Sequence, residues 1–221
     1  MKLITIDKDS HGTIATAWAV IFLILGAVAF FVHNLFIAIP AIVILLLFAF
    51  FVFWFHRVTD RPTPAGDGRT ITSVADGKVV IIEKVYEKEY FKDERIQVSV
   101  YMNFFDVHAN FWPMDGEVSY YKYHPGKYLL AFLPKASEKN EHSSTVIRNE
   151  HGEILFRQIA GTFARRIVCY SQEGLKTERG KQCGIIKFGS RIDMFLPLDC
   201  DVKVKVGELT RNCETIIAEL K

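Results

Sequence analysis

The chain lacks the features that mark nucleic-acid-binding proteins and disulfide-stabilised secreted domains. Its 221 residues carry a formal net charge of only +2, with no basic run interleaved with aromatics. Such a run would be needed to attract nucleic acid, so we expect no partner of that class. The four cysteines form no C-x-x-C pair and have no histidine at zinc-ligand spacing. We therefore expect reduced thiols, no metal site and a reducing compartment.

Charge is also missing from two long apolar stretches near the N-terminus, at residues 13–32 and 35–55. Each is close to the roughly 20 residues that a helix needs to cross a bilayer. His33 and Asn34 separate them, which predicts a tight antiparallel hairpin with both ends on one side of the membrane. Basic residues after the second stretch, beginning with Arg57, favour the cytoplasmic side. The sequence leaves open whether this hairpin spans the membrane or enters one leaflet.

The rest of the chain divides into a linker and a β-rich domain. Residues 1–57 form the predicted anchor, and residues 58–69 hold prolines, glycines and charges typical of a linker. Residues 70–221 form the predicted globular domain, which is mainly β, as a barrel or sandwich. Short β-branched or aromatic runs predict its strands, at residues 78–85, 95–102, 116–123, 128–133, 145–149, 154–159, 167–170, 184–188, 194–196 and 202–206.

Two segments of this domain contain candidate site residues. Asp76-Gly77 precedes an apolar run, and by itself it reads as an ordinary turn into a strand. Residues 103–116 place aromatic side chains around Asp106 and His108. Residues two apart on a strand face the same side, so the Asp106 carboxylate is expected to hold the imidazole. The alternative is a hydrogen-bonded histidine in an aromatic core.

A third segment holds Gly189-Ser190, with one predicted strand before it and another after it. The plain interpretation is a two-residue turn. The functional interpretation is a strained peptide bond beside a nucleophile, because glycine allows the Gly189 carbonyl to bend toward the Ser190 hydroxyl.

Taken together, the three segments in this order behind an apolar hairpin resemble the phosphatidylserine decarboxylase family in its short prokaryotic form. The resemblance covers nearly the whole globular part and rests on five motifs: Ala75-Asp-Gly77, Asp106-Val-His108, Gln158-Ile-Ala-Gly161, Ala164-Arg-Arg-Ile167 and Phe188-Gly-Ser-Arg-Ile-Asp193. It implies a fold like the barrel-sandwich hybrid of biotinyl and lipoyl domains. It also implies an enzyme of phospholipid biosynthesis that converts phosphatidylserine to phosphatidylethanolamine and CO2. Such an enzyme is expected at the bacterial cell membrane, with its catalytic domain on the cytoplasmic face.

The resemblance also implies that the precursor cuts itself between Gly189 and Ser190. The products are a β chain of residues 1–189 and an α chain of residues 190–221, which stay partners. Ser190 becomes a covalent pyruvoyl group, whose carbonyl acts as the electron sink of decarboxylation. Asp76 and His108 match a relay that activates the serine. Longer members carry a second histidine where this chain has Phe111, which leaves His108 as the local candidate base.

The remaining expectations concern supporting residues and rival functions. Asp106 is expected to support His108, and Arg165 and Arg166 either meet the lipid phosphate or are plain surface charges. A rival hypothesis is a non-enzymatic, membrane-anchored β-barrel interaction module. A hydrolase triad is less favoured, because Gly-Ser-Arg lacks the G-x-S-x-G elbow. Whether the chain forms a homo-oligomer stays open.

Overall fold

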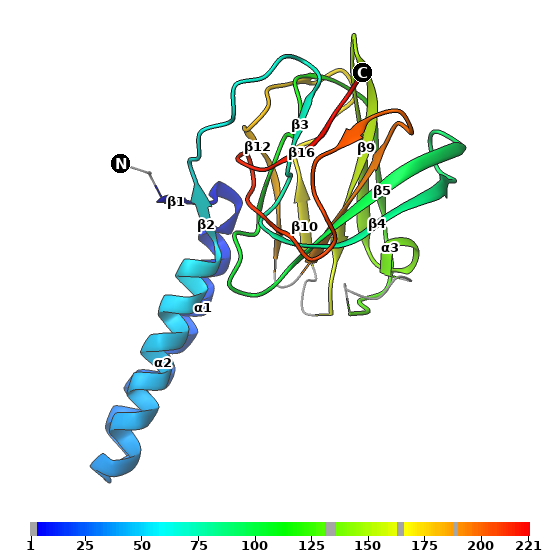
Figure 1. The fold of residues 1–221 in the computed structure, drawn as a ribbon. Helices are drawn as coiled ribbons and strands as arrows, with labels where there is room; N and C mark the ends of the chain where they lie inside the picture. Colours follow the sequence, from blue (N-terminus) through cyan, green and yellow to red (C-terminus); the bar gives the residue numbers. More distant parts are fainter. Residues whose placement is uncertain (1–3, 131–135, 163–165, 188–189) are drawn as a thin grey trace.

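Two apolar helices form a hairpin that projects from a β-rich domain (Figure 1). The computed structural model describes residues 4–130, 136–162, 166–187 and 190–221. After a short 3-10 turn, η1 (Lys8–Ser10), come α1 (His11–Phe31) and α2 (Leu35–Phe55). Both are long and apolar enough to cross a membrane. At 21 residues each, they are about 30 Å long, which equals the thickness of the hydrocarbon core. The predicted hairpin is confirmed.

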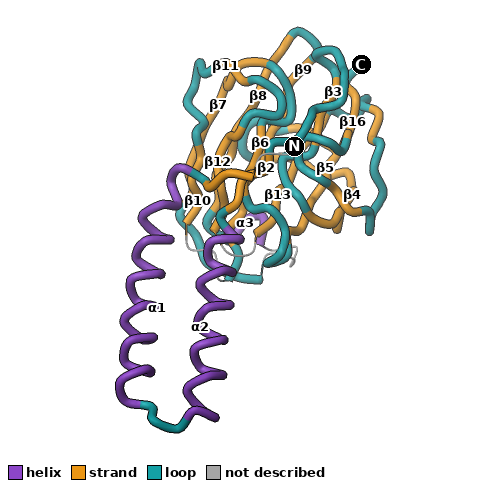
Figure 2. The backbone as a smooth tube through the Cα atoms, turned by 90° about the vertical axis from the view of Figure 1, so that its left-hand side faces the viewer, coloured by secondary structure: helices purple, strands orange, loops and turns teal. Residues whose placement is uncertain are grey.

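The two ends of the hairpin are fixed together at the domain. Strand β1 (Ile4–Ile6) pairs antiparallel with β2 (Arg57–Thr59), so the entry to α1 lies beside the exit from α2. Polar contacts then join this base to the domain. Tyr170 donates its hydroxyl to Asp9 over 2.6 Å, and Gln182 donates its amide to Asp7 over 2.7 Å. Figure 2 shows the two helices running side by side away from the strands.

The domain is built on an eight-stranded antiparallel sheet that curls around one core. Its strand order is β11-β7-β8-β9-β13-β5-β4-β15. The bounds, in chain order, are β4 (Gly77–Glu87), β5 (Asp93–Met102), β7 (Gly116–His124), β8 (His142–Asn149), β9 (Gly152–Ala160), β11 (Lys176–Thr177), β13 (Ser190–Leu196) and β15 (Leu209–Thr210). The fold class is therefore the one predicted, mainly β behind a helical hairpin.

Two three-stranded sheets complete the domain, in the orders β10-β12-β6 and β14-β16-β3. Their strands are β3 (Thr70–Thr72), β6 (Ala109–Phe111), β10 (Arg166–Cys169), β12 (Gln182–Lys187), β14 (Asp201–Val202) and β16 (Ile216–Glu219). The domain also contains a short helix, α3 (Ala136–Lys139). All four cysteines are free thiols, as expected. One of these sheets brings β12 next to β6, which joins the segment before Ser190 to the segment after His108.

Strand β13 separates two different environments in the domain. It lies between β9 and β5 in the large sheet. Side chains alternate along a strand, and Ile192 and Met194 on one face belong to the main hydrophobic core. Arg191 and Phe195 on the other face line a cavity of about 810 Å³. Ser190 shares the parity of Ile192, so its side chain belongs to the core face.

Three predicted segments differ from the structure. The alternation at 202–206 yields only β14, because a turn closed by a hydrogen bond from Glu208 N–H to Lys205 carbonyl ends the strand. Residues 128–130 are not a strand, and the rest of that predicted run lies outside the described residues. The predicted strand around Asp106 and His108 is a turn, and β6 begins one residue later.

Candidate active site

Ser190 begins β13 and is completely buried. Its register partners are Met102 on β5 and Ala160 on β9. The hydroxyl donates to the thioether sulfur of Met102 over 3.0 Å. A thioether is a weak acceptor, so this contact binds the hydroxyl loosely.

His108 is also completely buried and lies where the hairpin meets the domain. Its ring packs on the ring of Phe55, the last residue of α2, with centroids 4.2 Å apart. Its backbone carbonyl accepts from the N–H of Ile186 on β12. Burial lowers the pKa of His108 to about 3. The imidazole is therefore neutral at physiological pH and can accept a proton.

The hydrogen bonds around His108 correct one expectation about Asp106. The Asp106 carboxylate accepts from the N–H of Asn103 and caps the turn, over 2.8 Å. The backbone carbonyl of Asp106, rather than its carboxylate, lies 3.0 Å from Nδ1 of His108. A carbonyl only accepts, so Nδ1 carries the proton and the lone pair is on Nε2. The turn after β5 explains the difference, because the two side chains no longer share one face of a strand.

Asp76 is buried and is held by two groups that are far from it in sequence. Arg61 binds both carboxylate oxygens, one of them over 2.8 Å. The backbone N–H of Asn212 donates to the carboxylate as well, over 2.8 Å. The charge of Asp76 favours the protonated form of His108, although burial outweighs it. Asp76 thus acts on the imidazole through its charge.

Glycine is required after Asp76. Gly77 has a φ of +154°, and a Cβ at this position would lie 2.3 Å from the carbonyl oxygen of Tyr101. The backbone therefore approaches β5 more closely than any side chain allows. This close approach explains why a glycine follows Asp76.

The other predicted residues have mixed outcomes. Gly189 and Arg165 lie outside the described residues. Arg166 is exposed on β10 opposite Lys187, the last residue of β12. The Lys187 ammonium is buried against the first turn of α1, 3.1 Å from the carbonyl of Asp9. Phe111 is buried in β6 in a small apolar cluster, as a core residue.

The sequence interpretation missed several polar residues around Ser190 and His108. Arg191 and Asp193 form a fully buried ion pair on β13, at 2.5 and 2.9 Å. Arg61 belonged to the predicted linker, yet it holds Asp76. For Arg191 and Asp193, the i, i+2 spacing of opposite charges inside an apolar strand was a usable signal. For Arg61 there was no such signal, because its contact with Asp76 depends on the path of the chain in three dimensions.

Comparison with known proteins decides the family. A sequence model described as phosphatidylserine decarboxylase matches residues 48–218 of the chain. The chain belongs to the phosphatidylserine decarboxylase family. A phosphatidylserine decarboxylase proenzyme from Cytophaga hutchinsonii is 42% identical over 217 residues, which cover 97% of this chain and 98% of the relative.

Two further relatives carry the same name. The proenzyme from Amoebophilus asiaticus is 53% identical over 151 residues, which cover 68% of this chain and 67% of the relative. The proenzyme from Bacteroides thetaiotaomicron is 45% identical over 168 residues, which cover 76% of this chain and 74% of the relative. The chain is therefore an enzyme of the decarboxylase type that acts on phosphatidylserine, and the hypothesis of a non-enzymatic interaction module is wrong.

Proposed function

We propose that this decarboxylase cuts its own chain between Gly189 and Ser190 and then works through a pyruvoyl group formed from Ser190. The observation that carries the proposal is the buried serine at the start of a central strand. The family relatives named proenzymes give it further support. The cut separates residues 1–189 from residues 190–221, which remain hydrogen-bonded within one sheet through β13.

The cleavage begins with the Ser190 hydroxyl. Its proton passes to a base while Oγ attacks the carbonyl carbon of Gly189. The C–N bond breaks, the nitrogen takes up a proton, and an ester replaces the amide. Loss of the Cα proton of residue 190 then breaks the Cβ–O bond and releases Gly189 as a carboxylate. Water then hydrolyses the remaining unsaturated residue, which releases its nitrogen as ammonia and forms a ketone with the oxygen of the water.

His108 is the proposed base. It is neutral, with the lone pair on Nε2, and a neutral imidazole can take the serine proton. Two contacts support a position near the cleavage site. The backbone carbonyl of His108 accepts from Ile186, which is three residues before Gly189. Met102, which is six residues before His108, accepts from the Ser190 hydroxyl. Asp76 is the proposed electrostatic partner, whose negative charge stabilises the imidazolium that forms. Asp106 fixes the ring through its carbonyl.

The surroundings of residue 190 fit a small ketone, because they are dry and the neighbouring strands hold its backbone. When present, that group supplies a carbonyl that takes up the substrate amine and accepts the electrons released as CO2 leaves. Met102 and Ala160 keep the site free of charged neighbours on the core face. After CO2 leaves, His108 is the proposed donor that returns a proton to the substrate α-carbon.

The hairpin is the proposed membrane anchor, with residues 1–57 as anchor, 58–69 as linker and 70–221 as the catalytic domain. His108 packs on the end of α2, which supports a site that lies next to the membrane surface. Phe105 beside it is 73% exposed and contacts Phe51 of α2. We place the domain on the cytoplasmic face of the bacterial membrane. Arg165 and Arg166 are proposed contacts for the lipid phosphate.

The function is tested with purified full-length protein and vesicles that contain phosphatidylserine. The wild-type protein is expected to release CO2 and form phosphatidylethanolamine, and Ser190→Ala to do neither. Ser99→Ala is the matched control, because Ser99 is equally buried on the adjacent strand β5. A Ser190→Ala protein that keeps full activity would contradict the proposal.

A further inference from the structure

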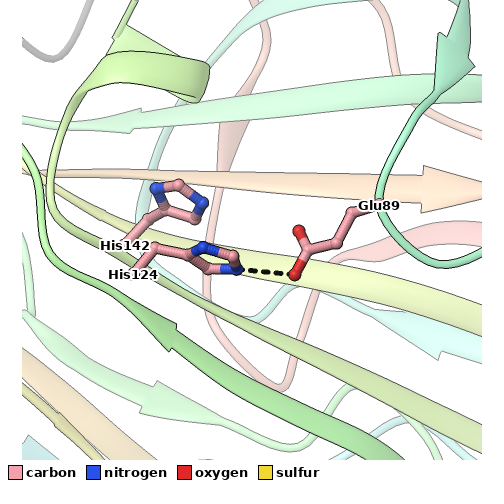
Figure 3. A group of neighbouring side chains, drawn as sticks. All are labelled: Glu89, His124 and His142. Carbon is pink, nitrogen blue, oxygen red and sulfur yellow. Dashed lines mark hydrogen bonds and ion pairs between the residues drawn. The ribbon is translucent and has the colours of Figure 1, made fainter.

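A second cluster of titratable side chains lies on the other face of the large sheet, away from Ser190. Glu89 follows the end of β4, His124 ends β7, and His142 begins β8. Figure 3 shows both imidazole rings stacked, with Glu89 reaching toward them from the opposite side. One potential ligand atom from each residue lies within 4.8 Å of the other two. The function proposed above uses none of these residues.

The strand register explains why the two histidines lie together. His124 and His142 are cross-strand partners in the β7–β8 pair. Directly opposed residues on antiparallel strands have their side chains on the same face. The rings are 4.4 Å apart and nearly parallel, at 16°. The sheet therefore presents two imidazoles side by side, independently of any ligand.

Hydrogen bonds already orient these ligands as metal sites require. Nδ1 of His142 lies 2.7 Å from the carbonyl of Asn140, so it carries the proton and leaves the lone pair on Nε2. A backbone carbonyl in this role is the usual outer partner of a metal-binding histidine. Nε2 of His124 lies 2.6 Å from Oε1 of Glu89. In Figure 3 a nitrogen of each ring is turned toward the side of Glu89.

Both oxygens of the Glu89 carboxylate are held, and Oε1, which faces the histidines, also accepts from the Tyr120 hydroxyl over 3.1 Å. Oε2 accepts from Ser144 and from Arg157, each over 2.8 Å. Arg157 also binds Glu87 over 2.8 Å, so its charge is shared between two carboxylates. All three candidate ligands line the cavity of about 810 Å³, which gives an ion room to enter and to keep water ligands.

We propose that Glu89, His124 and His142 form a binding site for a divalent transition-metal ion of the zinc type. Two imidazoles and one carboxylate, with an open fourth position, form a ligand set that Zn²⁺ accepts. Bonds of about 2.0–2.2 Å require the side chains to close in by roughly 1 Å. The ion would tie the loop after β4 to the adjoining ends of β7 and β8. It would thereby stiffen the wall of the cavity that Arg191 also lines.

The site is tested by titrating Zn²⁺ into the full chain in detergent after treatment with a chelator. Calorimetry is expected to give one ion per chain. Glu89→Gln and His142→Gln are each expected to weaken binding on the order of 100-fold or more, since each removes a ligand. His151→Gln is the matched control, because His151 pairs with a single glutamate at the far end of β8–β9. That variant is expected to bind Zn²⁺ as the wild type does.

Co²⁺ gives a second measurement that needs no variant. Bound to the wild-type chain, it is expected to show the visible bands of a four- or five-coordinate site with nitrogen and oxygen ligands. Thiolate charge-transfer bands would place the ion on a cysteine and overturn the proposal. It is overturned equally if the wild type binds no Zn²⁺, or if Glu89→Gln and His142→Gln bind it undiminished.

Discussion

The two faces of β13 place histidine in opposite surroundings. His108, the proposed base for Ser190 on the core face, is completely buried and packs against the end of α2. On the other face, His124 bonds a carboxylate and stacks on His142 in an open, charged cavity. The same side chain is the proposed neutral base in the first place and a proposed metal ligand in the second.

The difference shows that the residue type alone does not determine the chemical role of a histidine. Burial removes water from His108 and leaves its charged form unstable, so the ring can take a proton only transiently. Around Glu89, by contrast, a serine, an arginine and a histidine compensate the charge. The first environment disfavours a charge on the ring, whereas the second supplies partners for charged groups.

The largest expected effect is on the core face. His108→Ala removes the proposed base, so self-cleavage should slow by about 10²–10⁴-fold. The measurement is the fraction of uncut chain on a denaturing gel, followed over time after synthesis. Asp76→Asn should slow cleavage as well, by a smaller factor, because its contribution to His108 is electrostatic.

His142→Ala is the comparison variant from the other face, and it should cleave at the wild-type rate. If His108→Ala matures and turns over normally, both roles assigned to His108 are wrong. His108 would then be a packing residue, as the aromatic-core alternative states.

The next effect is on stability and belongs to the charged face. Asp193→Asn leaves Arg191 buried beside a neutral partner, which should cost about 3–5 kcal/mol in the free energy of unfolding. Denaturant unfolding of the purified protein measures it. Asp201→Asn is the control, because the ion pair between Asp201 and Lys203 is exposed to solvent and should contribute little to stability. Equal losses in the two variants would contradict the structural role of the buried pair.

A smaller effect is expected in the dependence of stability on pH. The pKa of His108 falls from its ordinary 6.5 to about 3 because the ring is buried. Between these values the unfolded chain binds a proton that the folded chain does not, so stability falls as pH drops from about 6.5 toward 3. Above pH 6.5 this contribution is complete and constant. In urea unfolding, His108→Ala should therefore lose less of its free energy of unfolding than the wild type as the pH falls.

His151→Ala serves as the reference, because that half-buried ring lies in the turn between β8 and β9. His56 is buried near His108, and burial lowers its pKa too, so part of the acid loss should persist in His108→Ala. An unaltered pH profile in His108→Ala would show that this ring is not held neutral by burial.

Local sequence patterns were enough for much of the fold. The uncharged stretches predicted both helices within two residues, because the length of a membrane-crossing helix is set by the bilayer. Alternating and β-branched runs predicted most strands, including the one that ends before Gly189. Prediction failed at 202–206, where the alternation is genuine but a turn closes on Glu208 and ends the pairing.

The sites depended more on contacts between distant residues. The order of motifs identified Ser190 and His108, and family resemblance did this work rather than any one spacing. Arg61 and the Glu89–His124–His142 cluster had no local signal. Each arises from strand register and loop path, which bring together residues 15 to 53 positions apart.

The most direct test of the account is the intact mass of the purified wild-type protein under denaturing conditions. We expect two chains, residues 1–189 and 190–221, the smaller one blocked at its N-terminus and reactive toward a carbonyl reagent. Ser190→Ala should give one chain of 25.3 kDa. A preparation that forms phosphatidylethanolamine while every molecule is a single uncut chain would contradict the pyruvoyl mechanism.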